Sequence, residues 1–242
     1  MTQVQQIFDD SAQRFGAQKI CAILADSGVR VSSKRISAIM QELDLQSIRT
    51  NAKSEYKKRQ KYLKQNLLKR NFKSERMNQT WVSDITYFKV NDYGIYLCVI
   101  LDLFSRKVVG YKVSRNSSTH LVTTTFRAAF QERGKPEGLT FHNDRGGQYI
   151  SSTFAELLRR CNVTQSFSVS GRPCDNAVAE TFFATFKKEE AYRRDYSSEN
   201  DFRKSVDQYI TFYNEARPHQ TLAYKTPVRF EKLYGGHEEA AL

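Results

Sequence analysis

The sequence predicts an α/β fold, in which a mixed five-stranded sheet with flanking helices follows a small all-helical module and a basic helix. After residue 79, short runs rich in β-branched and aromatic residues alternate with segments of helical period, whereas residues 1–45 show helical period only. With 242 residues and 40% hydrophobic content, the chain can bury one full core and a small second one. The predicted divisions are a helical module at 1–45, a basic linker helix at 46–78, the α/β core with a C-terminal helix at 79–234, and a tail at 235–242.

The order of elements in the core predicts the topology of the sheet. Three strands joined by short turns indicate an antiparallel meander, and the later strands alternate with helices, which is typical of a mixed sheet covered on both faces. The predicted strands cover residues 81–90, 96–101, 107–113, 138–141 and 163–168. The predicted helices cover residues 118–133, 151–161 and 199–215, with a further helix through Glu180.

The N-terminal module reads as three short helices, at residues 4–14, 17–26 and 33–43. Ser32 is the expected N-cap of the third helix, whose apolar stripe is Ile36, Ile39, Met40 and Leu43. Lys34 and Arg35 then face outward. A helix-turn-helix that places its second helix in a DNA major groove fits this pattern, and a helical packing module without groove contact fits it equally.

The charge of the chain is concentrated in one segment. The formal net charge is +12, and residues 46–78 carry eleven Lys or Arg against two Glu. This balance favours a polyanionic partner, although a ribosomal or membrane-surface protein could share it. We expect a basic helix that lies along DNA, with a solvated charged helix as the alternative. Its candidate DNA contacts are Lys57, Lys58, Arg59 and Lys61.

The cysteines and histidines exclude several classes of protein. All four of each are widely scattered and form no C-x-x-C pair, so a disulfide framework or a structural zinc site is not expected. No apolar stretch approaches the length of a bilayer span, and the N-terminus has no apolar signal core. We expect a cytoplasmic protein without a membrane segment.

Three acidic residues are the candidate catalytic groups. Asp84 interrupts a strand-like run from which aspartate is normally depleted, and Asp144 lies between a predicted strand and a Gly-Gly turn. Glu180 lies on an unobstructed face of its helix, with 35 residues between it and Asp144. Carboxylates suit Mg²⁺, and two ions about 3.5–4 Å apart can clamp the attacking and leaving oxygens of a phosphodiester. The sequence therefore predicts two Mg²⁺ ions, with Mn²⁺ able to substitute, bound by Asp84, Asp144 and Glu180.

Two other residues compete for a place in this site. Asp102 begins a tight turn, where aspartate normally caps its own backbone, so we assign it a structural role. His142 lies two residues before Asp144 and is a candidate for supporting that carboxylate or for contacting a phosphate; a packed histidine is the alternative.

Three motifs resemble those of a known family. They are His142–Tyr149 (HNDRGGQY), Gly171–Glu180 (GRPCDNAVAE) and Tyr213–His219 (YNEARPH). Together with the acidic triad, they resemble the OrfB transposases of the bacterial insertion-sequence-three family, which have a catalytic core like that of retroviral integrases. Asn143 and Gly147 depart from this pattern, because a serine or similar small residue is expected at both positions.

The resemblance implies a ribonuclease-H-like fold and a DDE transposase acting on the terminal inverted repeats of a mobile element and on target DNA, with a joined or circular first product. It also implies a DNA contact at Lys187, seven residues after Glu180, and favours the helix-turn-helix. Arg172, in the loop before the Glu180 helix, is a further candidate DNA contact. The expected partners are duplex DNA, other copies of the chain on that DNA, and the product of an upstream reading frame, as a partner or as a fusion, in the bacterial nucleoid.

The sequence thus predicts a transposase that cleaves element ends and joins the freed 3′-hydroxyl to a target phosphodiester. A structure-selective nuclease on the same fold is the first alternative. A catalytically idle DNA-binding regulator is the second.

Overall fold

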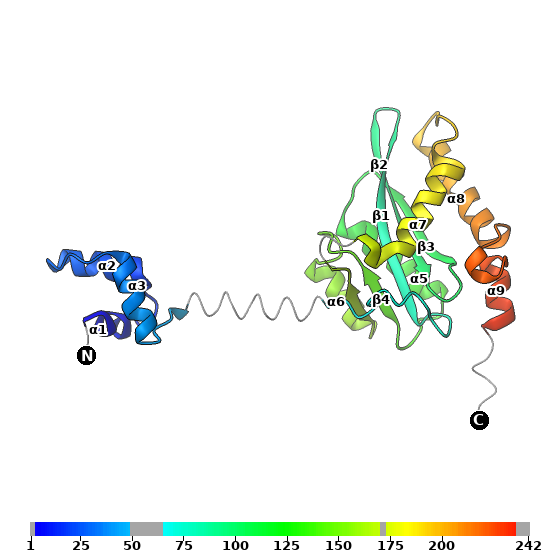
Figure 1. Ribbon diagram of the computed structural model, residues 1–242. Helices are drawn as coiled ribbons and strands as arrows, with labels where there is room; N and C mark the ends of the chain where they lie inside the picture. The colour runs from blue at the N-terminus through cyan, green and yellow to red at the C-terminus, as the bar shows by residue number, and fades with distance from the viewer. Residues whose placement is uncertain (1–2, 49–64, 170–172, 236–242) are drawn as a thin grey trace, which may run out of the picture. The chain divides into compact units, whose positions relative to one another are not determined.

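The computed structural model describes residues 3–48, 65–169 and 173–235 (Figure 1). The chain divides into two compact units, Met1–Leu63 and Lys64–Leu242. Almost all of the predicted tail lies outside the described residues. Across the described ranges, no helix combines the length and the apolarity needed to cross a bilayer.

The first unit contains three helices, α1 (Gln3–Asp10), α2 (Ala17–Asp26) and α3 (Ser33–Glu42). The first helix was predicted too long, at residues 4–14, and α1 ends at Asp10. Ala12 and Gln13 adopt positive φ angles of 51° and 62°, which a helix cannot accommodate. The Ser32 hydroxyl accepts a hydrogen bond from the Arg35 N–H at 3.3 Å, which confirms the predicted N-cap. The buried side chains of this unit are Val4, Phe8, Ile20, Leu24, Ile36 and Met40.

A five-stranded sheet in the order β3-β2-β1-β4-β5 forms the centre of the second unit. The strands β1 (Thr80–Val90), β2 (Tyr93–Asp102) and β3 (Val108–Ser114) are antiparallel neighbours, as predicted. The two short strands β4 (Thr140–Asn143) and β5 (Thr164–Phe167) continue the sheet in parallel on the other side of β1. The prediction of a mixed sheet is therefore confirmed, with β1 at its centre.

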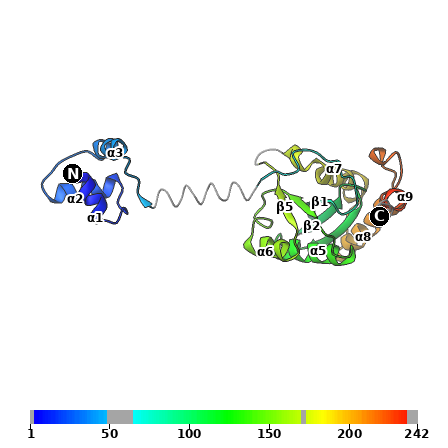
Figure 2. The same cartoon turned by 90° about the horizontal axis from the view of Figure 1, so that it is seen from below.

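Helices cover both faces of the sheet, because successive side chains of a strand point to opposite faces. Trp81 lies in one apolar core with residues of α5 (Thr119–Glu132) and α6 (Ser152–Arg160). Its neighbour Val82 lies in the other core, with residues of α7 (Ala177–Phe186) and α8 (Glu199–Glu215). Figure 2 shows α5 and α6 on one side of the strands and α7 on the other.

Shorter elements complete the second unit. They are η1 (Pro173–Asn176), the π-turn η2 (Lys187–Ala191), η3 (Gln220–Leu222) and α9 (Pro227–Tyr234). The helix α9 was not predicted, although two residues at its start favour a helix N-terminus. The Thr226 hydroxyl accepts a hydrogen bond from the Arg229 N–H, and Pro227 occupies the first turn.

The predicted linker helix is wrong for Gln65–Asn78, and residues 49–64 lie outside the described residues. Two asparagines in the described part bond nearby backbone instead of leaving it to a helix: the Asn66 side chain accepts from the Lys69 N–H, and the Asn71 side chain from the Lys73 N–H. Leu68 is buried against the core of the sheet. The apolar residues that suggested a helix therefore fasten an irregular segment to the second unit.

Candidate active site

Two aspartates directly follow the last residue pair that β1 and β4 share. That pair is Ser83 with Asn143, so Asp84 on β1 and Asp144, the first residue after β4, occupy equivalent positions in the parallel register. Neighbouring strands are about 4.8 Å apart, and equivalent residues of parallel strands point to the same face. Because β4 ends at Asn143 while β1 continues, Asp144 lies at the exit of a strand, as predicted.

Each aspartate is held by its own backbone. The Ile85 N–H donates to Oδ1 of Asp84 at 2.8 Å, and the Gly146 N–H donates to Oδ1 of Asp144 at 2.9 Å. A Cβ atom at Gly146 would lie 3.0 Å from Asp144 Oδ1 and 3.1 Å from Gln148 Oε1, so glycine permits this close approach. Asn143, which departs from the expected serine, is fully buried and donates its side-chain N–H to the Asp144 carbonyl.

The helix α7 brings Glu180 to this end of the sheet. Phe182 and Phe186 lie in the core between β1 and α8, and the Phe186 ring lies 5.6 Å from that of Phe88 on β1. Val178, four residues before Phe182, is only partly buried. Glu180 lies on the exposed face of α7. The aromatic side therefore fixes the rotation of the helix and leaves the carboxylate accessible.

The three acids act on one another electrostatically. Burial raises the pKa of Asp84 from 3.8 to about 7, and the charges of Asp144 and Glu180 add to this rise. The bond from Ile85 and the charge of Lys187 oppose it. Among the described residues, no group of three or more His, Cys, Asp or Glu side chains is gathered closely enough to form a metal site as it stands.

A buried Asp-Asn pair connects the start of α7 to the rest of the unit. Oδ1 of Asp175 accepts from Arg70 Nε at 2.8 Å, and Oδ2 accepts from the Asn66 side chain and the Val169 N–H, both at 2.9 Å. The next residue, Asn176, donates its side-chain N–H to the carbonyl of Ser83, the residue before Asp84. This pair therefore ties Glu180, one helical turn later, to β1 and to the segment before the sheet.

His142 supports the same junction. It is fully buried, with Nδ1 2.8 Å from Ser166 Oγ, and Nε2 3.0 Å from the Asp175 carbonyl oxygen and 3.1 Å from Ser168 Oγ. Burial lowers the pKa of His142 to about 4. The structure thus gives it the packed position that we left open, and a buried neutral imidazole is poorly placed to contact a phosphate.

The family of the chain follows from its similarity to known proteins. The chain is 32% identical over 232 residues to the transposase for insertion sequence element IS904 of Lactococcus lactis, with 95% of this chain and 92% of that protein covered. It is also 32% identical over 227 residues to the transposase InsF for insertion sequence IS3A of Escherichia coli, with 93% and 79% covered. The chain belongs to the IS3 family of transposases.

Family descriptions and solved structures agree with this assignment. Residues 74–173 and 161–227 match two families described as integrase core domain, and residues 1–53 match an HTH-like domain. A chain of the simian T-cell lymphotropic virus intasome in complex with PP2A regulatory subunit B56 gamma is similar at a TM-score of 0.58 and 17% identity, with 70% of this chain and 58% of that chain covered. The HTLV-2 integrase catalytic core domain in complex with magnesium, in its trimeric form, is similar at a TM-score of 0.52 and 19% identity. The match covers 64% of this chain and 97% of that chain. At this identity, the likeness shows the ribonuclease-H-like fold.

Lys187 of the transposase lies beside the three acids. It is the first residue of η2, directly after α7, and its ammonium nitrogen lies 5.8 Å from the centre of the Phe88 ring. Its charge lowers the pKa of Asp84. The structure therefore places Lys187 close to the carboxylates, where a DNA backbone contact was predicted.

The other predicted DNA contacts belong to the first unit or lie outside the described residues. Lys34 and Arg35 are exposed on α3 of the first unit. The remaining candidates lie outside the described residues; they are Lys57, Lys58, Arg59, Lys61 and Arg172.

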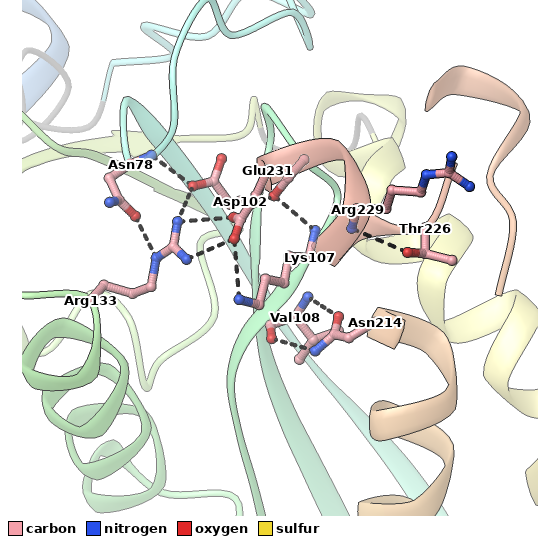
Figure 3. A network of polar contacts seen from close by, with 10 residues as sticks. Asn78, Asp102, Lys107, Val108, Arg133, Asn214, Thr226, Arg229 and Glu231 are labelled. Atoms are coloured by element: carbon pink, nitrogen blue, oxygen red, sulfur yellow. Dashed lines mark hydrogen bonds and ion pairs between the residues drawn. The ribbon is translucent and has the colours of Figure 1, made fainter. Parts of the chain in front are cut away.

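Asp102 has the structural role that its position in a turn predicted. It is fully buried, with Oδ1 accepting from the Phe104 N–H at 2.8 Å and Oδ2 from the Asn78 N–H at 2.7 Å. Arg133 Nη2 lies 3.7 Å from Asp102 Oδ2, and the Arg133 guanidinium also donates to the Glu231 carboxylate of α9 (Figure 3). This network attaches α9 to the turn after β2.

The third sequence motif is also architectural. The Asn214 side chain bonds both the N–H and the carbonyl of Val108 on β3, at 2.9 and 3.0 Å (Figure 3). Arg217 makes a bidentate pair with Glu189 of η2. The motif therefore fixes the end of α8 to β3 on one side and to η2 on the other.

Proposed function

We propose that Asp84, Asp144 and Glu180 are the catalytic triad of this transposase and hold the divalent cations of a phosphoryl-transfer reaction. One observation carries the proposal: Asp84 and Asp144 directly follow the last parallel pair of β1 and β4, and burial, with the charges of Asp144 and Glu180 adding to it, raises the pKa of Asp84. Three acids that repel one another at an accessible edge are a costly arrangement, unless a cation offsets the repulsion.

The donor set fits Mg²⁺, which prefers a few carboxylate oxygens together with water and phosphate oxygens. The HTLV-2 integrase core, which shares the fold, has been solved with magnesium. When bound, two Mg²⁺ ions would supply Lewis-acid stabilisation of the attacking and leaving oxygens. The chain itself would position Asp84 and Asp144 through backbone bonds, orient Glu180 through the aromatic side of α7, and attract the DNA backbone through Lys187.

In this proposal the transposase cuts at the end of its mobile element and then uses the freed 3′-hydroxyl to attack a second phosphodiester. Water and the hydroxyl are alternative nucleophiles at the same site. The HTH-like unit would recognise the element ends through α3, with Lys34 and Arg35 on its exposed face. Several copies would assemble on the DNA, with the product of an upstream reading frame as a further partner or fusion.

The test uses labelled duplex DNA carrying the element ends, Mg²⁺, and a gel that resolves nicked from joined products. Asp84→Asn, Asp144→Asn and Glu180→Gln should each abolish cleavage and joining together while DNA binding survives. Combining two of these substitutions should add little, because residues that act as a unit are strongly non-additive.

Asp102→Asn is the matched control, since its Oδ1 can still cap the turn and strand joining should persist. Strand joining by the Glu180→Gln protein, or its loss in a folded Asp102→Asn protein, would show that the wrong acids were chosen. Hydrolysis without joining would favour the nuclease alternative.

A further inference from the structure

A cavity of about 510 Å³ lies beside α7, next to the face that carries Glu180. Its walls come from α7, from the segment after α8 and from Arg106, and they include Ala177, Thr181, Tyr213, His219 and Tyr224. Thr181 directly follows Glu180 and Ala177 precedes it by three residues, so the cavity adjoins that carboxylate on the helix surface. None of the described residues that line the cavity is acidic. A polyanion crossing the candidate active site can therefore approach it without repulsion from its walls.

Two buried polar atoms of this cavity lack partners. Arg106 Nη1 and His219 Nε2 form no hydrogen bond with any residue that the structure describes. His219 is only 8% exposed, and its ring bonds the Tyr213 backbone carbonyl and lies 4.5 Å from the Tyr213 ring. Because a carbonyl only accepts, the bonded ring nitrogen carries the proton, and Nε2 of the neutral ring is an acceptor. Two residues that line the cavity, Arg106 and His219, thus hold one unused donor and one unused acceptor, both buried beneath the accessible surface.

An exposed aromatic residue completes the cavity. Tyr224 is 71% exposed, and it and Ala223 adopt positive φ angles of 59° and 50°. A bulky residue with positive φ is a backbone outlier that costs about 1–3 kcal/mol and occurs in turns and at ligand clamps. The strained turn therefore holds a flat ring in solvent at the rim of the cavity.

We propose that this cavity receives an unstacked nucleobase of the DNA strand being processed, with Tyr224 stacking on the base and with His219 Nε2 and Arg106 Nη1 bonding its edge. Each of the four bases presents a donor next to an acceptor on its Watson–Crick edge, which is free only when the base leaves the duplex. The complementary acceptor and donor of the wall therefore favour an extruded base without selecting its identity. This inference rests on the proposed function, because DNA passes the cavity only if Glu180 faces the scissile strand.

The experiment places 2-aminopurine, whose fluorescence rises when it unstacks, at each base flanking the cleavage point of an element-end duplex. The full chain carries Glu180→Gln, so that the DNA remains intact. We expect a rise at one position. Tyr224→Ala should abolish it and weaken binding of that duplex by roughly 5- to 150-fold, the value of one stacked base. Tyr224→Phe should retain both. Tyr192→Ala is the matched control, because Tyr192 is also 71% exposed and does not line this cavity.

The proposal would be overturned if 2-aminopurine fluorescence rose at none of the positions, or if it rose and Tyr224→Ala left the rise unchanged. A change of oligomeric state in Tyr224→Ala without a change in fluorescence would also overturn it, and would make the occupant of the cavity a second copy of the chain. A gel of the same samples keeps the two proposals apart. Strand joining by the Glu180→Gln protein would contradict the assignment of the triad, and it would leave the fluorescence result intact.

Discussion

The burial of Asp84, together with the charges of Asp144 and Glu180, predicts that Asp84→Asn stabilises the metal-free protein at neutral and alkaline pH. The folded state raises the pKa of Asp84 from 3.8 to about 7, so the native protein binds this proton more tightly than the unfolded chain does. Below pH 4 the carboxyl is protonated in both states and Asp84 costs nothing. As the pH rises from 4 to 7 the native state loses stability, and above 7 the loss is complete.

The size of the effect follows from the same values. A pKa change of one unit corresponds to 1.36 kcal/mol, so ionised Asp84 costs the fold at most about 4 kcal/mol, and about 2 kcal/mol if water screens the partly exposed carboxylate. Asparagine keeps the oxygen that accepts from the Ile85 N–H and carries no charge. The free energy of unfolding should therefore be higher for Asp84→Asn by about 2–4 kcal/mol at pH 8, and the difference should vanish near pH 4.

Urea unfolding in EDTA at the two pH values measures this difference. Asp92→Asn, in the exposed turn between β1 and β2, is the control and should match the wild type at both. Mg²⁺ added at pH 8 should then stabilise the wild type more than the Asp84→Asn protein. Equal stability of wild type and Asp84→Asn at pH 8 in EDTA would refute the claim that burial and the neighbouring acids make ionised Asp84 costly to the fold.

Three other outcomes are expected. Gly146→Ala should lower strand joining by about 10-fold or more, because a Cβ 3.0 Å from Asp144 Oδ1 must displace the carboxylate. Gly147→Ala is the control and should be active, because its added Cβ meets nothing within 4 Å. Equal activity of the two proteins in the gel assay would contradict this prediction. Asp175→Ala should lower the free energy of unfolding by about 1–3 kcal/mol in urea, since it removes the hydrogen bonds that a buried carboxylate makes to Asn66, Arg70 and Val169. An unchanged midpoint would show that the pair is dispensable. Replacing Lys57, Lys58, Arg59 and Lys61 with glutamine should flatten the dependence of log affinity for duplex DNA on log salt by about 0.9 per lost phosphate contact, and an unchanged slope would remove these residues from the interface.

The elements around the acids could be predicted from sequence because their signals are local. Phe182 and Phe186 repeat with the period of a helix and are buried, and the Gly146–Gly147 turn marks where β4 has ended. The turn residue Asp102 was recognised for the same reason, since its cap is two residues away. Helix periodicity and turn chemistry need only a few neighbouring residues to be expressed.

The parts that were missed depend on distant partners or on competing local bonds. Asp175 bonds Arg70, 105 positions earlier in the chain, and nothing in its own neighbourhood indicates that partner. The prediction of a linker helix was wrong for residues 65–78 because the Asn66 and Asn71 side chains bond nearby backbone N–H groups. Leu68 is buried in the core of the second unit. Tyr224 gave no signal at all, because exposure and positive φ are visible only in three dimensions.

The attachment of Asn66 and Arg70 to Asp175 also bears on where the catalytic part of the chain begins as an independent folding unit. The first integrase-core match starts at residue 74, whereas the compact second unit starts at Lys64. A fragment cut at the family boundary would lose Leu68 from its core and two of the side chains that hold Asp175, and would leave that carboxylate buried without its cation. Such a fragment should express poorly or misplace the α7 glutamate, whereas one that begins at Lys64 carries the whole unit. Similarity between sequences marks what relatives share, and the compact unit begins ten residues before that match.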